Sequence, residues 1–403
     1  MKYDFKRLVE ETAWIEGSFV RKYHESNRPS KVDEFEVSDA QRIVKKPLVS
    51  YCVLVYNKKE FLRECVDSIL SQDAPCSFEI ILSEDESTDG SRELCFELQR
   101  EHPDVIRVVY AAENVGVLQN HLRALSRVRG EFIACVDGDD YFCSKSTLRR
   151  QVEFLRQHDE YSMVYTAFYT QCETHKITRV PISYRTIRKC VEMECAKNPL
   201  AMARSLLRHN PIAASSTLIR KCDMGGFADW IDCLSKYMRW FPSQDFETWF
   251  YVATRGLAHF DCEFSEVYRH NAGALTSAAI DVANARKLGD IRNKIAIVAH
   301  EGEKLFDEKE QDYWVDVFLH QVANCLALLP EETTRMKCAE MRYAVELSEK
   351  SGLFNEDHLR EQRKKMLLPK RVKYGSLFRR ALRGFCMRML NACMLMTYRG
   401  VEG

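Results

Sequence analysis

The sequence predicts an α/β fold, a mostly parallel sheet flanked by helices, and the pattern of residues 47–142 supports this prediction. Short apolar runs alternate four times with amphipathic segments, as strands and helices do in a parallel sheet. The first run, LVSYCVLV at 48–55, is a continuous apolar run, which is typical of a strand buried on both faces. With 403 residues, 46% hydrophobic and 29% charged, the chain can bury a substantial core, which excludes a disordered or fibrous protein.

The expected elements follow in chain order. The predicted strands lie at 48–55, 78–82, 105–110 and 131–136, and the predicted helices at 60–72, 90–100 and 117–129. In the first of these helices the apolar residues return every three or four positions and line one face. After residue 145 we expect a helix at 147–157, a strand at 163–169, helices at 199–208 and 245–255, and a helical stretch at 281–362 interrupted by Gly302 and Pro330.

Composition divides the chain into three parts. We expect a helical N-terminal extension at 1–46, a main domain at 47–280 with halves at 47–142 and 143–280, and a helical C-terminal region with a basic tail at 281–403. The tail from 363 to 403 mixes basic and apolar residues at helical spacing, which suits a helix lying on an anionic membrane. The same pattern also suits a helix docked on the protein's own surface.

Charge and cysteine content narrow the class of protein. The 59 Lys and Arg residues balance 59 Asp and Glu residues, which argues against a general nucleic-acid binder. The 16 cysteines are scattered without a CxxC pair, so we expect reduced packing cysteines rather than a disulfide scaffold or a zinc module. No signal peptide and no apolar run of ~18 residues are apparent, and we therefore expect a cytoplasmic protein.

Polar residues follow three of the predicted strands at the end where parallel sheets bind ligands. These are Tyr56-Asn57, Glu84-Asp85-Glu86 and Asp137-Gly138-Asp139-Asp140. In the last cluster an Asp-x-Asp pair places two carboxylates on one side of an extended chain, where they can share Mg²⁺ or Mn²⁺. Each cluster taken alone also fits an ordinary turn, strand end or helix cap. Chain order brings all three to one edge of the sheet, which favours a site.

Several segments resemble the family 2 glycosyltransferases, inverting nucleotide-sugar enzymes of the GT-A fold, of the type that builds bacterial surface polysaccharides. The similar segments are 49–57, 78–92 (FEIILSEDESTDGSR), 113–120, 130–142 (GEFIACVDGDDYF), 210–221 (NPIAASSTLIRK), 243–249 and 268–277 (YRHNAGALTS). The resemblance covers about 47–277. It therefore implies a GT-A domain followed by a helical C-terminal region.

The resemblance also implies site residues. Tyr56 would lie against the base of the nucleotide, Asp85 would accept a hydrogen bond from uracil with Glu84 beside it, and Asp137 would lie next to the ribose or the metal. Asp139 would be the principal ligand of Mn²⁺ or Mg²⁺. The general base would be an aspartate at the start of the helix expected at 245–255.

That aspartate is Asp245, and Glu247 is the next candidate for the base. Without the resemblance, Asp245 fits an acid stabilised at a helix N-terminus by the dipole. Two positions depart from the family pattern. Glu86 replaces a frequent glycine, and Asn271 stands where many members have a histidine that joins the metal in some of them. His270, one residue earlier, is read as a structural histidine.

The sequence therefore predicts a metal-dependent inverting glycosyltransferase. Its donor would be a nucleotide-sugar, most simply a UDP-sugar, and its acceptor a hydroxyl of a bacterial surface glycan or of a lipid-linked saccharide. We expect it in the cytoplasm, with the basic tail as a peripheral contact to the inner face of the cell membrane, and with no nucleic acid as a partner. The alternatives are a non-catalytic glycan-binding or scaffold subunit of a synthesis complex and a sugar nucleotidyltransferase. The latter would need a glycine-rich loop after the first strand, where the sequence reads Tyr56-Asn57-Lys58-Lys59.

Overall fold

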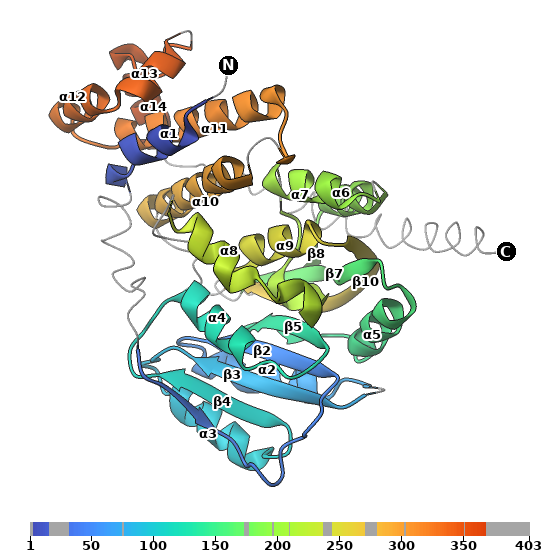
Figure 1. Ribbon diagram of the computed structural model, residues 1–403. Helices are drawn as coiled ribbons and strands as arrows, with labels where there is room; N and C mark the ends of the chain where they lie inside the picture. The colour runs from blue at the N-terminus through green and yellow to red at the C-terminus, as the bar shows by residue number, and fades with distance from the viewer. Residues whose placement is uncertain are drawn as a thin grey trace.

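A computed structural model describes residues 3–15, 32–74, 76–172, 177–195, 197–208, 210–236, 244–270, 280–301, 304–349 and 351–367. These residues contain one ten-stranded sheet with the order β1-β4-β3-β2-β5-β9-β7-β10-β6, in which β8 pairs with β7 (Figure 1). The strands are β1 (Glu34–Val37), β2 (Val49–Val55), β3 (Phe78–Glu84), β4 (Ile106–Ala111), β5 (Phe132–Asp137), β6 (Tyr141–Phe142), β7 (Tyr161–Cys172), β8 (Ile177–Pro181), β9 (Thr217–Arg220) and β10 (Leu257–His270).

The sheet is mixed, and its majority direction is the one expected. Strands β2, β3, β4, β5, β7 and β10 run in one direction, and β1, β6, β8 and β9 run against them. The predicted parallel unit forms the centre, because β4, β3, β2 and β5 are neighbours and parallel. The antiparallel β9 then joins this half of the sheet to β7 and β10.

Both faces of the central strands are buried. In β2, Val49, Tyr51 and Val53 pack into one hydrophobic core, and Cys52 and Leu54 pack into the other. This alternation follows from the period of two in a strand, and it explains why β2 is apolar at nearly every position. The described cysteines are free thiols, and several of them are buried in these cores.

Helices cover the two faces. Those on the first face are α2 (Lys59–Leu70), α3 (Ser91–Glu101) and α5 (Thr147–Gln157). Those that contribute to the second core include α4 (Val117–Ser126), α6 (Tyr184–Cys195), α7 (Pro199–Arg208), α8 (Phe227–Leu234) and α9 (Asp245–Ala253). Beyond α8 and α9 lie α10 (Ile280–Glu301), α11 (Glu308–Ala327), α12 (Glu331–Glu340), α13 (Arg342–Ser348) and α14 (Glu356–Leu367), together with α1 (Phe5–Glu11) (Figure 1). No helix of the described residues is both long enough and apolar enough to cross a membrane.

The described part of the N-terminal extension contains a strand as well as a helix, whereas only helix was expected. Its helix α1 packs on the C-terminal helices, where the amide of Asp4 donates to the hydroxyl of Tyr343 at 2.7 Å. Its strand β1 joins the edge of the sheet beside β4. Glu36 of β1 accepts from Arg107 of β4 at 2.9 Å. The strand is short and charged, as exposed edge strands often are, so hydrophobic periodicity does not reveal it.

The stretch before residue 198, which has no predicted element, also contains secondary structure. Strand β8 pairs with the long strand β7, and helix α6 buries Ile187 and Cys190. Among the described side chains of α6, at 186–192, the buried ones are these two. The remaining predicted strands and helices are present, with ends shifted by up to about five residues.

Candidate functional site

The three polar clusters meet at one edge of the sheet, as predicted. The register pairs Val55 of β2 with Glu84 of β3, and Leu54 of β2 with Asp137 of β5. The segments that follow these strands therefore leave the sheet side by side at their carboxyl ends. This is the edge at which open parallel sheets bind ligands.

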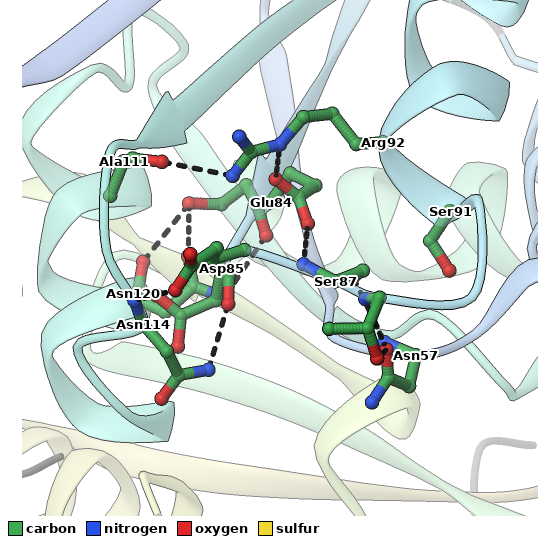
Figure 2. Close-up of polar contacts among 12 residues, drawn as sticks. Asn57, Glu84, Asp85, Ser87, Ser91, Arg92, Ala111, Asn114 and Asn120 are labelled. Carbon is green, nitrogen blue, oxygen red and sulfur yellow. Dashed lines mark hydrogen bonds and ion pairs between the residues drawn. The ribbon is translucent and has the colours of Figure 1, made fainter.

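Tyr56 and Asn57 have different surroundings at this edge. The Tyr56 side chain is exposed, at 47% of its full area. Asn57 adopts a left-handed backbone with φ of 54°, which asparagine tolerates better than most residues. Its side-chain oxygen accepts from the backbone amide of Thr88 at 2.8 Å, and its own backbone amide donates to the Ser87 hydroxyl at 2.9 Å. Figure 2 shows Asn57 beside Ser87. Asn57 thus ties two clusters together and leaves the neighbouring ring exposed.

Glu84 is fully buried and bound from within the protein. One of its oxygens accepts from the Arg92 guanidinium at 2.5 Å, and the other accepts from the amide of Ser87 at 2.5 Å (Figure 2). Arg92 also donates to the carbonyl of Ala111 at 2.9 Å. Glu84 therefore fixes the loop between β3 and α3. Its place beside a nucleotide stays a prediction.

Asp85 is also buried, and it fixes the segment that leads into α4. Its two oxygens accept from the amides of Val115 and Gly116 at 3.1 Å and 2.9 Å. Burial raises the pKa of this carboxyl, while those amides and the Arg123 guanidinium act in the opposite direction. The side chain of Asn114 donates to the carbonyl of Asp85 at 2.7 Å (Figure 2). A hydrogen bond from Asp85 to a uracil remains a prediction.

The conformation at Glu86 accounts for its departure from the family pattern. Its φ is 59°, in the left-handed region that glycine adopts without strain. Its carboxylate accepts from the amide of Asn114 at 2.8 Å, a contact that glycine could not make. The left-handed backbone is less favourable for glutamate than for glycine, but the Glu86 side chain adds a hydrogen bond across the loop.

The Asp-x-Asp pair lies at the end of β5. Asp137 accepts from the side chain of Gln244 at 3.2 Å, and Asp139 accepts from the ammonium of Lys58 at 2.5 Å. Gly138 is required because the turn packs closely on a neighbouring strand. A Cβ at this position would lie 2.9 Å from the carbonyl oxygen of Leu54, so the turn packs directly on the backbone of β2.

Asp140, the next residue, is buried and holds the turn in place. It accepts from the hydroxyl of Ser215 at 2.8 Å and from the amide of Arg269 at 2.9 Å. Burial raises its pKa well above the ordinary range, and the charges of Asp139 and Asp137 add to the effect. We expect Asp140 to act as a structural acid.

Sequence reasoning assigned no role to Arg269, although it lies inside the Tyr-Arg segment that resembled the family. Its guanidinium donates to the carbonyl of Asp139 at 3.0 Å and forms an ion pair with Glu64 of α2. It also lies over the ring of Tyr141, 4.4 Å from the centroid. Together with Ser215, Arg269 fixes the backbone that presents the Asp-x-Asp carboxylates.

The candidate base Asp245 is the first residue of α9. Its predecessor Gln244 is bonded to Asp137, which places the start of α9 beside the Asp-x-Asp turn. Burial raises the pKa of the nearby Cys135 thiol, and the charges of Asp137 and Asp245 raise it further. The structure therefore brings Asp245 and Asp137 to the same edge from positions far apart in the sequence.

Glu247, the other acid of this turn, is fully buried rather than directed to the edge. It accepts from the side-chain amide of Asn293 in α10. Burial raises its pKa well above the usual value, and the charges of Asp245 and Asp290 raise it further. An acceptor hydroxyl would not reach this carboxyl, so Glu247 links α9 to the C-terminal helices.

Glu247→Gln should flatten the dependence of stability on pH. The folded protein retains a proton on Glu247 that the unfolded chain releases above its usual pKa of 4.5, so the native state binds more protons. Stability therefore falls as pH rises from that value until the raised folded pKa is reached, by up to about 1.4 kcal/mol per pH unit. Urea unfolding at several pH values checks this, with the exposed Glu153→Gln as control. If the free energy of unfolding changed equally with pH in Glu247→Gln and Glu153→Gln, Glu247 would be ionised in the folded state.

His270 ends β10 and follows Arg269, whose backbone amide and guanidinium bond to Asp140 and Asp139. His270 packs its ring against Tyr268, with centroids 4.9 Å apart, and burial lowers its pKa. Asn271, the alternative position for a metal-binding side chain, lies outside the described residues.

The carboxylates of Asp137 and Asp139 suit a hard divalent cation. Within the described part of the chain, no group of three or more His, Cys, Asp or Glu side chains is arranged to hold a metal. Mg²⁺ and Mn²⁺ sites of nucleotide enzymes need fewer, because one or two carboxylates act with water and substrate phosphates. The Lys58 ammonium on Asp139 shows that this carboxylate already accepts a cation.

Parts of the chain are similar to known proteins. The model of the family described as "Glycosyl transferase family 2" matches residues 50–208. Among curated relatives, a glycosyltransferase of Streptococcus pneumoniae, GlyG, is 37% identical over 110 residues, which are 26% of this chain and 35% of that protein. A poly(ribitol-phosphate) beta-glucosyltransferase of Bacillus spizizenii is 31% identical over 102 residues, 25% of this chain and 16% of that one. An uncharacterized protein of Mycobacterium bovis is 33% identical over 112 residues, 28% of this chain and 32% of its own.

Each of these matches spans well under half of the relative's length. Two solved structures are also similar. Staphylococcus aureus TarS (residues 1–349) in complex with UDP-GlcNAc has a TM-score of 0.43 at 19% identity, covering 75% of this chain and 92% of that one. A mannosyltransferase of Pyrobaculum calidifontis in complex with GDP-Man and Mn²⁺ has a TM-score of 0.49 at 16% identity, covering 91% and 99%.

Proposed function

We propose that the chain is a GT-A type enzyme of glycosyl transferase family 2, whose model matches residues 50–208, and that it moves a sugar from a nucleotide-sugar donor to an acceptor hydroxyl with inversion. The observation that carries this proposal is the bond of 3.2 Å between Gln244 and Asp137. It joins the turn with the candidate metal ligands to the helix that begins with the candidate base. The nucleotide and acceptor ends of one displacement reaction thereby lie next to each other.

The nucleotide would bind over the carboxyl ends of β2, β3 and β5. The exposed ring of Tyr56 offers a flat face for the base. Asp85 would accept from a uracil, with Glu84 supporting the loop, and Asp137 would lie next to the ribose. These assignments rest on the family resemblance and on the position of all four residues at one edge. They make a UDP-sugar the first donor to test.

Asp139, assisted by Asp137, would hold Mn²⁺ or Mg²⁺ together with the donor phosphates. Such an ion, when bound, offsets the charge that develops on the departing diphosphate. The chain's own contribution is to keep both carboxylates on a fixed turn, through Arg269 and Asp140. Fixed charges of this kind need little reorganisation during the reaction.

Asp245 would take the proton of the acceptor hydroxyl onto a carboxylate oxygen. As that proton leaves, the acceptor oxygen forms its bond to the anomeric carbon, and the bond from this carbon to the diphosphate oxygen breaks. The attack comes from the face opposite the nucleotide. One displacement without a covalent intermediate inverts the configuration at that carbon.

The acceptor is proposed to be a growing bacterial surface glycan or a lipid-linked saccharide. One relative is a poly(ribitol-phosphate) beta-glucosyltransferase, and this supports a surface polymer as acceptor. A cytoplasmic enzyme at the inner face of the membrane would meet such acceptors. The rival role, a non-catalytic scaffold subunit, would not require the carboxylates of Asp137, Asp139 and Asp245 at one edge.

Incubation of the full chain with a panel of nucleotide-sugars, with and without Mn²⁺, tests the proposed function. We expect release of the nucleoside diphosphate from at least one donor, and a large loss of release in EDTA. A donor at a hundred times its dissociation constant should also stabilise the fold by ~2.7 kcal/mol, which thermal shift detects. Neither turnover nor binding of any donor would favour the scaffold subunit.

The basic tail is proposed to hold the enzyme on an anionic membrane. Most of it, 368–403, lies outside the described residues. Its first residue, Arg363, is bonded to the carbonyl of Ala327 at 2.6 Å and therefore belongs to the folded helices. Deletion of 368–403 rather than 363–403 should keep turnover of a soluble acceptor and abolish cosedimentation with phosphatidylglycerol vesicles. Unchanged cosedimentation would show that the tail does not provide the membrane contact.

A further inference from the structure

Lys58 forms the ion pair with Asp139 from a fixed position. It precedes α2, and its amide donates to the hydroxyl of Ser91 at 2.8 Å. Its side chain passes over Gly138, with its Cγ 3.6 Å from the place where a Cβ would be. Its ammonium then lies 2.5 Å from Asp139 Oδ2. The backbone of Lys58 is held by Ser91 and its aliphatic chain lies against Gly138, so the ammonium is directed to this carboxylate.

The pair is largely removed from water. The Lys58 side chain is 19% exposed and the Asp139 side chain 8%. Opposite charges attract more strongly in such surroundings than at an open surface. The ammonium occupies Oδ2, one of the two oxygens with which Asp139 could bind a divalent cation. Because two cations on one carboxylate repel each other, the ammonium and the metal compete for Asp139.

We propose that Lys58 is a built-in counter-ion that excludes metal from Asp139 until a nucleotide diphosphate is present. This inference rests on the proposed function, because it assumes that Asp139 is a metal ligand. The diphosphate of the donor provides a new anionic partner for the ammonium when the metal displaces it. Metal and nucleotide therefore bind with positive coupling, and each raises the affinity for the other by the same factor.

The chain provides a matched control in the adjacent lysine. The Lys59 ammonium lies 2.8 Å from the place where a Cβ of Gly90 would be, on the side of the loop that leads into α3. Lys59→Met removes the same charge and the same type of stem as Lys58→Met. Lys58→Arg retains the charge and the pairing with Asp139.

Mn²⁺ titrations of the full-length protein, followed by the EPR signal of free Mn²⁺ with and without UDP, test the proposal. Without UDP, Lys58→Met should bind Mn²⁺ about tenfold more tightly than the wild type, while Lys59→Met and Lys58→Arg should stay close to it. With UDP the wild type should gain affinity for Mn²⁺, and Lys58→Met should gain much less. Melting curves with Mn²⁺ give an independent readout of the same binding.

Equal Mn²⁺ affinity in Lys58→Met and the wild type, with Asp139→Ala abolishing binding in both backgrounds, would overturn the proposal and leave the metal site intact. Weaker binding in Lys58→Met would also overturn it, since the lysine would then support the metal. If Mn²⁺ bound to none of the proteins while a nucleotide-sugar was still turned over, competition between Lys58 and the metal would be excluded. The sugar transfer would then proceed without a metal. Absence of turnover and of donor binding in all of them would instead remove the proposed function itself.

Discussion

Asp245→Asn should lower the catalytic rate by about 10²- to 10⁴-fold, the usual contribution of a positioned base, and leave donor and Mn²⁺ affinity almost unchanged. The amide keeps the shape of the carboxylate and removes the atom that takes the proton. The hydrogen bond from Gln244 to Asp137 does not use the Asp245 side chain, so it should persist. Single-turnover rates at saturating donor, with separate titrations of UDP and Mn²⁺, measure the two effects independently.

Loss of stability is the main confounding effect in this variant. An acid in the first turn of a helix contributes ~0.3–1 kcal/mol through the helix dipole. Asp229→Asn is a suitable control, because Asp229 is an exposed acid in the first turn of α8. Both variants should melt close to the wild type, and only Asp245→Asn should be inactive. Lost donor binding in Asp245→Asn would indicate a structural or metal-binding role, and near-normal transfer would place the base on another residue.

The parallel centre of the sheet could be predicted because its signals are local. Each strand of this half is a short apolar run, and polar residues mark the ends of β2, β3 and β5. Parallel pairing then brings these ends together without any further information. The prediction that the three clusters share one edge is confirmed by the pairing of Val55 with Glu84 and of Leu54 with Asp137.

The contacts within the site could not be predicted, because they depend on pairings that are distant in the sequence. Lys58 and Asp139 are separated by 81 positions, and Arg269 and Asp139 by 130. Nothing local in Tyr-Asn-Lys-Lys shows which lysine turns toward the aspartate. The burial of Glu84 depends in the same way on Arg92 and on the loop that closes over it. Sequence reasoning identified the acidic residues but not their partners.

The base helix illustrates how packing separates two similar acids. Asp245 and Glu247 are two residues apart, and both fit an acidic helix start. A helix turns about 100° per residue, so the two side chains leave α9 on opposite sides. The Glu247 side is covered by α10 with Asn293, whereas Gln244, the residue just before Asp245, bonds to Asp137 at the sheet edge. Only the position of α10, which lies beyond the region resembling the family, distinguishes the two.

Asp139→Ala should abolish nucleotide binding that depends on Mn²⁺, because the ion is held by few protein ligands and each is a large part of its site. Asp137→Ala should have a milder effect, since Asp137 also pairs with Gln244 and would act at the ribose as well as at the metal. Calorimetric titration of UDP at fixed Mn²⁺ measures both, and repetition in EDTA gives the metal-independent part.

Removal of the Asp139 carboxylate also leaves the partly buried Lys58 ammonium without this partner. Some loss of stability is therefore expected in Asp139→Ala, and Asp139→Asn, which keeps the shape and a hydrogen-bond acceptor for Lys58, separates the two effects. Both variants should lose Mn²⁺-dependent binding, while Asp139→Asn should melt nearer to the wild type. Full transfer activity of either variant at low Mn²⁺ would show that the Asp-x-Asp pair does not hold the metal, and the edge of the sheet would then bind its nucleotide through Lys58 and the backbone alone.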